Sequence, residues 1–198
     1  STDNCAIASL VLSQTAFVCS EVGANTEVLT VTDVNGNSTT CTTTITVEDN
    51  VAPIAVCQNI TVQLDNSGNG FTTATAVNNG SSDACGIASL VLSQTAFVCS
   101  EVGANTEVLT VTDVNGNSAT CSTTITVEDT VAPSAICQNI TVALDANGDI
   151  IVTAAEINNG SNDACGIASI TLDGNQSQLS FDCSDVGINT VTLTVTDV

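Results

Sequence analysis

The chain has 198 residues, of which 21 are Asp or Glu and none is Lys, Arg or His, so its formal net charge at pH 7 is −21. Without imidazole, amine or guanidinium side chains, it has no His or Lys base, no Schiff-base nucleophile and no arginine to bind a phosphate. The charge also repels nucleic acid and anionic lipid, which proteins hold mainly through Lys and Arg, so we expect no nucleic-acid partner and no membrane insertion.

The apolar content predicts a folded protein. Hydrophobic residues make up 43% of the chain and the mean hydropathy is +0.36, so a core can be buried despite the acidity. No apolar stretch approaches the roughly 18 residues that span a bilayer. The first residues lack a basic and apolar export signal, so we expect that Ser1 is not the native start.

A long internal repeat organises the sequence. Residues 7–38 are identical to residues 87–118, at a shift of 80. The cysteines repeat at the same shift: Cys5 with Cys85 and Cys165, Cys41 with Cys121, and Cys57 with Cys137. A period of this length suits a small domain rather than one coil of a solenoid.

The repeat predicts three domains. They are expected at 1–50, the C-terminal part of a first repeat, at 51–130, a complete repeat, and at 131–198, a third repeat that lacks its last strand. The third copy carries four additional residues, because Cys183 lies 84 positions after Cys99. We expect the array to continue beyond both ends, with neighbouring repeats of the same chain as partners.

Residues 51–130 show short β-rich runs between clusters of Asn, Asp, Gly and Ser, a pattern typical of an all-β sandwich. In chain order we expect a strand at 54–64, a turn at 65–70, a strand at 71–77, a loop, a hairpin of 87–93 with 96–99, a strand at 107–114, a tight NGN turn and a last strand at 120–127. In the last strand, alternation places Cys121, Thr123, Ile125 and Val127 on one face. The sequence therefore predicts tandem antiparallel β-sandwiches of about 80 residues each.

The strand order predicts disulfides within each domain. The first and last strands should run side by side in the same direction, which brings Cys57 to Cys121. Cys85 and Cys99 flank the expected hairpin and should also pair. The insertion has an even number of residues and leaves the faces of this hairpin unchanged. The equivalent pairs in the other repeats are Cys5 with Cys19 and Cys165 with Cys183.

Under this pairing, two cysteines need partners outside the chain. Cys41 and Cys137 would pair with equivalents that fall before residue 1 and after residue 198. A competing scheme joins neighbours, Cys41 with Cys57 and Cys121 with Cys137, and uses all ten cysteines. Either scheme indicates an oxidising compartment outside the cytoplasm. The absence of CxxC and of His disfavours zinc.

Three segments carry a family resemblance. VEDNVAPIAVCQNITVQLD, NNGSSDACGIASL and VLTVTDVNGNSATCSTTITVED are similar to hyalin-type (HYR-like) immunoglobulin-fold repeats, and more closely to the tandem repeats of giant secreted Bacteroidota surface proteins, including the SprB-type gliding adhesins. The resemblance implies Ig-like domains in a long extracellular stalk or filament at the cell surface, used for attachment or gliding motility. The lack of Lys and Arg and the near-identity of two copies depart from that pattern.

Acidic and amide residues gather where consecutive domains should abut, and hard cations prefer such oxygen ligands. The candidate calcium ligands are Glu48, Asp49, Asp83, Asp113 and Asn115 at one junction and Glu128, Asp129, Asp163 and Asp197 at the other. EDNVAP also resembles the calcium-bridged linkers of cadherin-like domains. Alternatively, these acids are solvated loop residues and TDVNGN is only a hairpin turn.

Three classes of function compete on this evidence. A structural and adhesive array fits best, because repetition supplies length rather than a unique pocket; it would contact an extracellular surface or polysaccharide, or associate laterally with other copies. A calcium-dependent glycan-binding or cell-adhesion module is the alternative, but four Phe with no Trp or Tyr offer few platforms for sugars. A hydrolase with paired carboxylates would need one cleft in which two carboxyl groups have different pKa values. Identical repeats do not provide such a cleft. We expect no enzyme.

Overall fold

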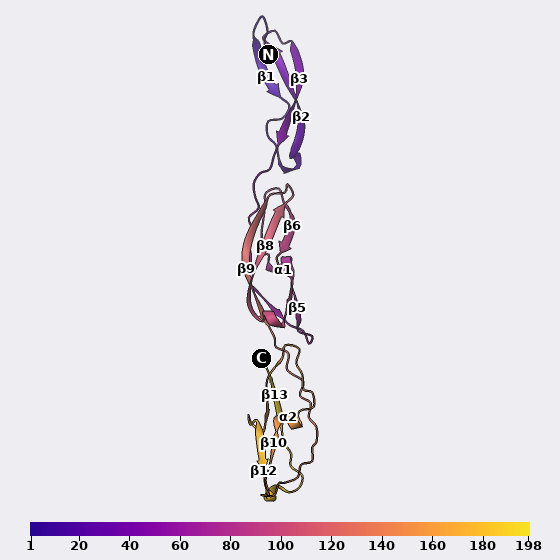
Figure 1. Ribbon diagram of the computed structural model, residues 1–198. Coiled ribbons are helices and arrows are strands. Elements are labelled where there is room, and N and C mark those ends of the chain that lie inside the picture. Colours follow the sequence, from indigo (N-terminus) through magenta and orange to yellow (C-terminus); the bar gives the residue numbers. More distant parts are fainter. The chain divides into compact units, whose positions relative to one another are not determined.

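The computed structural model describes residues 1–198 and is built mainly from β-strands (Figure 1). Contacts divide the chain into two compact units, one of residues 1–58, 77–93 and 108–122 and the other of 59–76, 94–107 and 123–198. Both units take residues from 51–130, so the three predicted domain ranges stay a prediction. Below, first, second and third repeat mean residues 1–50, 51–130 and 131–198.

The first repeat forms one antiparallel sheet in the order β1-β2-β3. Its elements are β1 (Ile7–Leu12), the 3₁₀ helix η1 (Cys19–Glu21), β2 (Gly23–Asp33) and β3 (Ser38–Val47). The β2-β3 hairpin closes at an NGN turn, where the Asp33 amide donates to the Asn37 carbonyl over 2.9 Å. Gly36 adopts φ +89° there, a left-handed value that glycine takes at little steric cost.

The second repeat forms two sheets, as expected for a β-sandwich. One sheet has the order β4-β9-β8-β6 and the other pairs β5 with β7. The elements are β4 (Ile60–Gln63), β5 (Asn69–Phe71), α1 (Ala74–Val77), β6 (Ile87–Leu92), β7 (Ala96–Val98), η2 (Cys99–Glu101), β8 (Gly103–Asp113) and β9 (Ser118–Glu128). β4 runs parallel to β9, with Ile60 opposite Ile125. The predicted adjacency of the first and last strands is confirmed, but of the first strand predicted at 54–64 only residues 60–63 form a strand.

The core of the second repeat follows from the alternation of its strands. Leu109 and Val111 on β8, and Ile125 and Val127 on β9, are at most 1% exposed. The Thr residues between them are only partly buried. Phe97 on β7, in the other sheet, is 1% exposed. Both sheets therefore contribute fully buried apolar side chains, as the sequence period of two predicts.

Two predicted elements of the second repeat are wrong. Residues 71–77 do not continue as a strand, because the Ala76 amide donates to the Thr73 hydroxyl and carbonyl and a single helical turn, α1, forms instead. Residues 87–93 and 96–99 do not form a hairpin with each other. β6 pairs with β8, whereas β7 pairs with β5, so the two segments belong to different sheets.

The third repeat contains two two-stranded sheets, β10-β12 and β11-β13. Its elements are β10 (Ile150–Thr153), α2 (Ala154–Ile157), β11 (Ile167–Leu172), β12 (Gln178–Phe181), η3 (Cys183–Asp185) and β13 (Leu193–Asp197). Its core cluster consists of Val152, Ala154, Ile157, Leu172 and Leu193. The four inserted residues form a tight turn after β11, closed by a bridge between Leu172 and Gln176, and the flanking strands keep their sheet partners.

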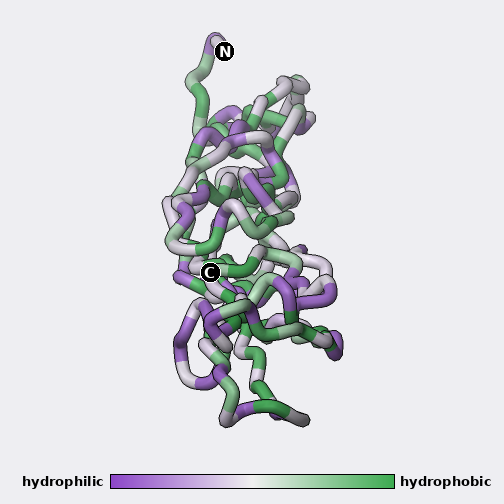
Figure 2. The backbone as a smooth tube through the Cα atoms, turned by 60° about the horizontal axis from the view of Figure 1, so that its bottom comes forward, coloured by the Kyte–Doolittle hydropathy of each residue, from purple (hydrophilic) through white to green (hydrophobic).

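Hydrophilic and hydrophobic residues alternate at short intervals along the backbone (Figure 2). This alternation is the signature of strands that present one face to a core and the other to water. None of the helices is of a length and apolarity that would let it span a membrane.

Candidate functional site

One disulfide lies within the second repeat. Cys57 and Cys121 are bonded, with their Cα atoms 5.9 Å apart. Cys57 precedes β4 and Cys121 lies on β9, and the parallel pairing of these strands brings the two residues together. This pairing confirms the sequence prediction and excludes the competing scheme, which joined Cys57 to Cys41 and Cys121 to Cys137.

The other two disulfides join one repeat to the next. Cys19 of the first repeat is bonded to Cys85 of the second, and Cys99 of the second is bonded to Cys165 of the third. The Cα atoms are 5.1 and 5.0 Å apart, within the usual range for disulfides. Each link spans 66 residues, and the second repeats the first at a shift of 80. The covalent framework is therefore periodic.

Three predicted disulfides are wrong: Cys5 with Cys19, Cys85 with Cys99, and Cys165 with Cys183. The reason is the pairing of β6 and β7 with different strands, which removes the hairpin that would have brought Cys85 to Cys99. In the third repeat, β11 and β12 likewise lie in different sheets. Cys5, Cys41, Cys137 and Cys183 are exposed free thiols. Partners for Cys41 and Cys137 outside residues 1–198 stay a prediction.

Local hydrogen bonds position the cysteines of the first link. Cys19 begins η1, and the Glu21 carboxylate on this turn accepts from the Gln14 side chain over 2.6 Å and from the Val18 amide over 2.8 Å. These bonds, the Gln14 bond first, lower the pKa of Glu21 below its ordinary value. On the partner side, Asp83 accepts from the Cys85 amide over 2.7 Å. Both backbone segments are thus fixed by a carboxylate.

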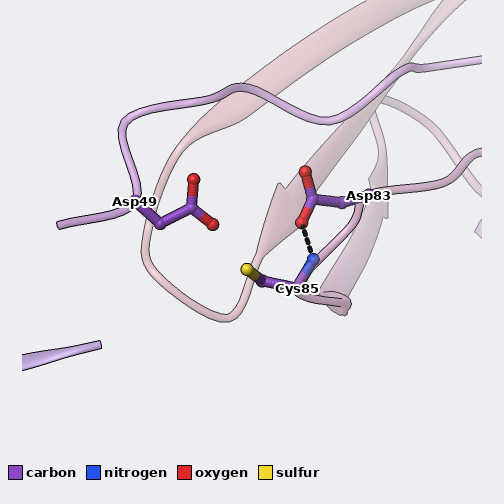
Figure 3. Close-up of side chains that lie close together, drawn as sticks. All are labelled: Asp49, Asp83 and Cys85. Carbon is purple, nitrogen blue, oxygen red and sulfur yellow. Dashed lines mark hydrogen bonds between the residues drawn. The ribbon is translucent and has the colours of Figure 1, made fainter. Parts of the chain in front are cut away.

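Two carboxylates converge beside this link. The carboxylates of Asp49 and Asp83 and the sulfur of Cys85 offer atoms that all lie within 4.8 Å of one another (Figure 3). Asp49 follows β3, and the side-chain amide of Asn117 donates to its carbonyl over 3.0 Å. Asp83 lies in the loop before β6. Because Cys85 is bonded to Cys19, its sulfur is not a thiolate, and the two carboxylates are the anionic groups of this cluster.

The same cluster recurs one repeat later. Asp129, Asp163 and Cys165 are brought within 4.8 Å in the same way, and Cys165 is held in the bond to Cys99. Asp163 accepts from the Cys165 amide over 2.8 Å, as Asp83 does from Cys85. A small hollow of about 180 Å³ lies beside Asp163. Four of the nine predicted metal ligands are therefore brought together, as two pairs.

Asp113 and Asn115 instead form the predicted NGN turn. The Asp113 carboxylate accepts from the amides of Asn115 and Asn117, over 2.9 and 2.8 Å, and from the Asn117 side chain over 2.8 Å. Asp113 as a whole is 1% exposed. Burial acts to raise the pKa of Asp113, but these hydrogen bonds, together with one from Gly116, outweigh it and lower the pKa. Both of its oxygens are engaged in closing the hairpin.

The remaining predicted ligands lie outside both clusters. Glu48 accepts from the side chain of Asn50 over 3.2 Å, and Glu128 accepts from that of Gln63 over 2.6 Å. Asp197 ends β13 and lies opposite Ile167. These three acids lie at or next to the ends of β3, β9 and β13, and a metal-binding role for them stays a prediction.

Comparison with known proteins gives no match to a family model or to a curated protein. The extracellular cadherin domains 1–4 of protocadherin gamma B7 align over 97% of this chain and 67% of theirs, with 13% identity and a TM-score of 0.34. The Bacteroides ovatus protein SGBP-B of a mixed-linkage glucan utilization locus, solved with a mixed-linkage heptasaccharide, aligns over 96% of this chain and 57% of its own, with 12% identity and a TM-score of 0.18. Likenesses at this level carry no argument about function.

Proposed function

We propose that this chain is a structural repeat segment of a long extracellular stalk, filament or adhesin that serves surface attachment or gliding motility. The observation that supports the proposal best is the pair of disulfides that run from one repeat to the next, Cys19 to Cys85 and Cys99 to Cys165. Disulfides form and persist in oxidising compartments such as the cell exterior. A protein that only needed a binding pocket would gain little from joining its repeats covalently.

The two links shorten the covalent path through the chain. A pulling force applied to the ends can pass along residues 1–19, cross to Cys85, follow residues 85–99, cross to Cys165 and leave along 165–198. This path contains about a third of the backbone. The other residues are bypassed and cannot be drawn out, even if their strands unfold. The two links therefore limit the maximum extension of the oxidised chain under tension.

Single-molecule pulling on the full chain tests this role. The oxidised chain should extend to on the order of 230 Å, and the fully reduced chain to about 690 Å, at about 3.5 Å per residue. Disulfides within each repeat, as the hairpin prediction had them, would allow about half of the reduced length. An oxidised extension equal to the reduced one would contradict the proposal.

Matched variants separate the links from general stability. Replacing Cys99 and Cys165 with Ser removes one crossing, so the maximum extension should increase. Replacing Cys57 and Cys121 with Ser should leave the maximum extension unchanged, because the shortest covalent path does not use that bond. If both double variants lengthen the chain equally, the links do not define the path of force.

We further propose that calcium binds weakly to the carboxylate pairs Asp49 with Asp83 and Asp129 with Asp163. Each pair converges beside a disulfide that joins two repeats, and the chain carries no cationic side chain that could neutralise it. Two carboxylates supply at most four oxygens, so backbone carbonyls and water would complete the six to eight that calcium takes. An ion there would stiffen the same joints that the disulfides close.

Calorimetric titration with calcium tests this site. The wild-type chain should bind two ions with dissociation constants of about 10⁻⁴ to 10⁻³ M, the range of extracellular modules. The variant with Asp83→Asn and Asp163→Asn should lose this heat. The matched variant with Glu48→Gln and Glu128→Gln should keep it, because those acids lie outside the clusters. Equal binding by both variants would overturn the assignment.

A further inference from the structure

Six asparagines of this chain are followed directly by glycine. In such a pair the glycine nitrogen can approach the preceding side chain closely, because glycine has no Cβ to block it. All six asparagines except Asn69 are exposed, so exposure alone does not distinguish the pairs. The six are Asn35, Asn69, Asn79, Asn115, Asn147 and Asn159.

Four of the six glycines are held in a hydrogen-bonded turn or in a strand ladder. Three of them, Gly36, Gly116 and Gly148, donate their amides to the carbonyl of the Asp three residues earlier, over 3.1 to 3.4 Å, and also toward its carboxylate. The fourth, Gly70, is buried in β5 opposite Phe97. An amide beside a carboxylate is hard to deprotonate, because its anion would form next to a like charge.

The other two glycines, Gly80 and Gly160, have free amides. Neither amide donates a hydrogen bond, and neither do the side chains of the preceding Asn79 and Asn159. The φ values of the two glycines are +83° and +85°, so the two turns have the same conformation. A Cβ built on either glycine would have no neighbour within 4 Å. In these two pairs, the attacking nitrogen and the side chain that it would attack are therefore both unhindered.

We propose that Asn79 and Asn159 are sites of spontaneous deamidation, with water as the co-reactant. The Gly80 nitrogen gives its proton to a base in the solvent and attacks Cγ of Asn79. The new N–Cγ bond closes a succinimide ring, the Cγ–Nδ2 bond breaks, and ammonia leaves with a proton from water. Water then opens the ring at either carbonyl and gives Asp or isoaspartate, without any change of oxidation state. Asn159 and Gly160 react in the same way, whether or not the chain is a stalk.

The turn that contains Asn79 holds residues 54–58, the segment that leads into β4. The Asn79 amide donates to the Val56 carbonyl over 2.9 Å, and the Ser81 hydroxyl accepts from the Val56 amide over 2.9 Å. Within the turn, the Ser81 amide donates to the side-chain oxygen of Asn78 over 3.1 Å. Isoaspartate adds one carbon to the backbone between these bonds. We therefore expect the bonds to break and residues 54–58 to loosen.

The third repeat holds its equivalent segment, residues 134–138, in the same way. The Asn159 amide donates to the Ile136 carbonyl over 2.8 Å, and the Ser161 hydroxyl accepts from the Ile136 amide over 2.9 Å. The chain therefore carries two copies of the same site, and each can serve as the control for the other.

Incubation of the oxidised full chain at mildly alkaline pH, with its free thiols capped, tests the assignment. Peptide mapping by mass spectrometry after incubation in ¹⁸O-labelled water quantifies Asp and isoaspartate at each pair. Asn79 and Asn159 should react about five- to tenfold faster than the asparagines before Gly36, Gly116 and Gly148, which corresponds to one protecting hydrogen bond. In the reduced and unfolded chain, all six should react at similar rates, because each precedes a glycine. Equal rates in the folded chain would overturn the proposal.

A matched variant tests the loosening of the two segments. Asn79→Gln should stop the reaction at this site, because glutamine would have to close a larger ring, and Asn159 should react as before. Incubation of the wild-type chain should speed amide hydrogen exchange in residues 54–58 and 134–138, whereas in the variant it should speed exchange only in 134–138. Equal loosening of 54–58 in the variant, or unchanged exchange in a deamidated wild-type chain, would overturn this consequence.

Discussion

The segments 7–38 and 87–118 have the same 32 residues and nearly the same local structure, yet they differ in burial. Each contains a strand, a 3₁₀ turn and a long second strand, paired in the same register. Leu109 and Val111 are fully buried, whereas their counterparts Leu29 and Val31 are only partly buried. Identical sequence thus gives these three elements in both copies but not an identical core, and residues 96–98 form β7 whereas residues 16–18 form no strand.

The difference comes from residues 51–80. They supply β4, β5 and α1 to the second repeat, and with them the buried side chains of Val62, Leu64 and Val77. Residues 1–50 contain no counterpart of this stretch, and Glu27 is the one buried residue of the first repeat. The β1-β2 and β6-β8 ladders therefore form in both copies, whereas β7 and a buried core form only where residues 51–80 supply the second layer.

The largest expected effect comes from truncating one leucine in each copy. Leu109→Ala removes a fully buried side chain and should lower the free energy of unfolding of the second repeat by about 2–5 kcal/mol. Leu29→Ala should cost the first repeat less than about half of that, because its side chain is already partly in water. Amide hydrogen exchange, resolved by peptide, measures each repeat separately. Equal losses at the two positions would contradict the account of burial.

A smaller effect is expected from adding a methyl group at two turn glycines. Gly68 has φ +74°, and a Cβ built there would lie 2.5 Å from the sulfur of Cys99. Gly36 has φ +89° with open space around it. Gly36→Ala should therefore cost only the backbone strain, about 1–2 kcal/mol. Gly68→Ala should cost more and should also slow formation of the Cys99 to Cys165 bond, measured by thiol labelling during refolding.

The smallest expected effect concerns acid. Hydrogen bonds from Asn37, the side chain first, lower the pKa of Asp33 below 3.8, and Asp113 is lowered by the equivalent bonds against its burial. A carboxyl with a lowered folded-state pKa stabilises the protein above about pH 4, and this contribution is lost as pH falls through the folded-state value.

The stability of the wild-type protein should therefore fall on acidification below about pH 4. Asp113→Asn and Asp33→Asn should each flatten this dependence, measured by denaturant unfolding between pH 2 and 6. The turn residues are the same in both copies, so each variant leaves one of the two equivalent turns unchanged as a control. A dependence that neither substitution changes would show that these turns do not set it.

Features with a local cause could be predicted from the sequence. The NGN turns follow from residues that accept positive φ cheaply, and the alternation of Cys121, Thr123, Ile125 and Val127 fixed the inward face of β9. The parallel pairing of first and last strands gave the Cys57 to Cys121 bond. The Asp49 with Asp83 pair also follows, because both acids were expected where two repeats meet.

Features that depend on which strand pairs with which could not be predicted in this way. Short runs such as 87–93 and 96–99 carry no signal that distinguishes a hairpin from two strands in different sheets, since both alternate alike. The predicted hairpin would have brought Cys85 next to Cys99. In the structure these cysteines are instead bonded to Cys19 and Cys165, respectively. The strand predicted at 71–77 was also wrong. The helical turn there depends on hydrogen bonds from the Ala76 amide to Thr73, and a helix of a single turn leaves no periodic pattern in the sequence.

The central claim is that disulfides join consecutive repeats, and peptide mapping of the oxidised chain under non-reducing conditions tests it most directly. We expect a cross-linked pair of peptides containing Cys19 and Cys85, and a second pair containing Cys99 and Cys165. Replacing Cys85 with Ser should free Cys19 while Cys99 stays bonded. A cross-link between Cys85 and Cys99 in the wild-type chain would contradict the account.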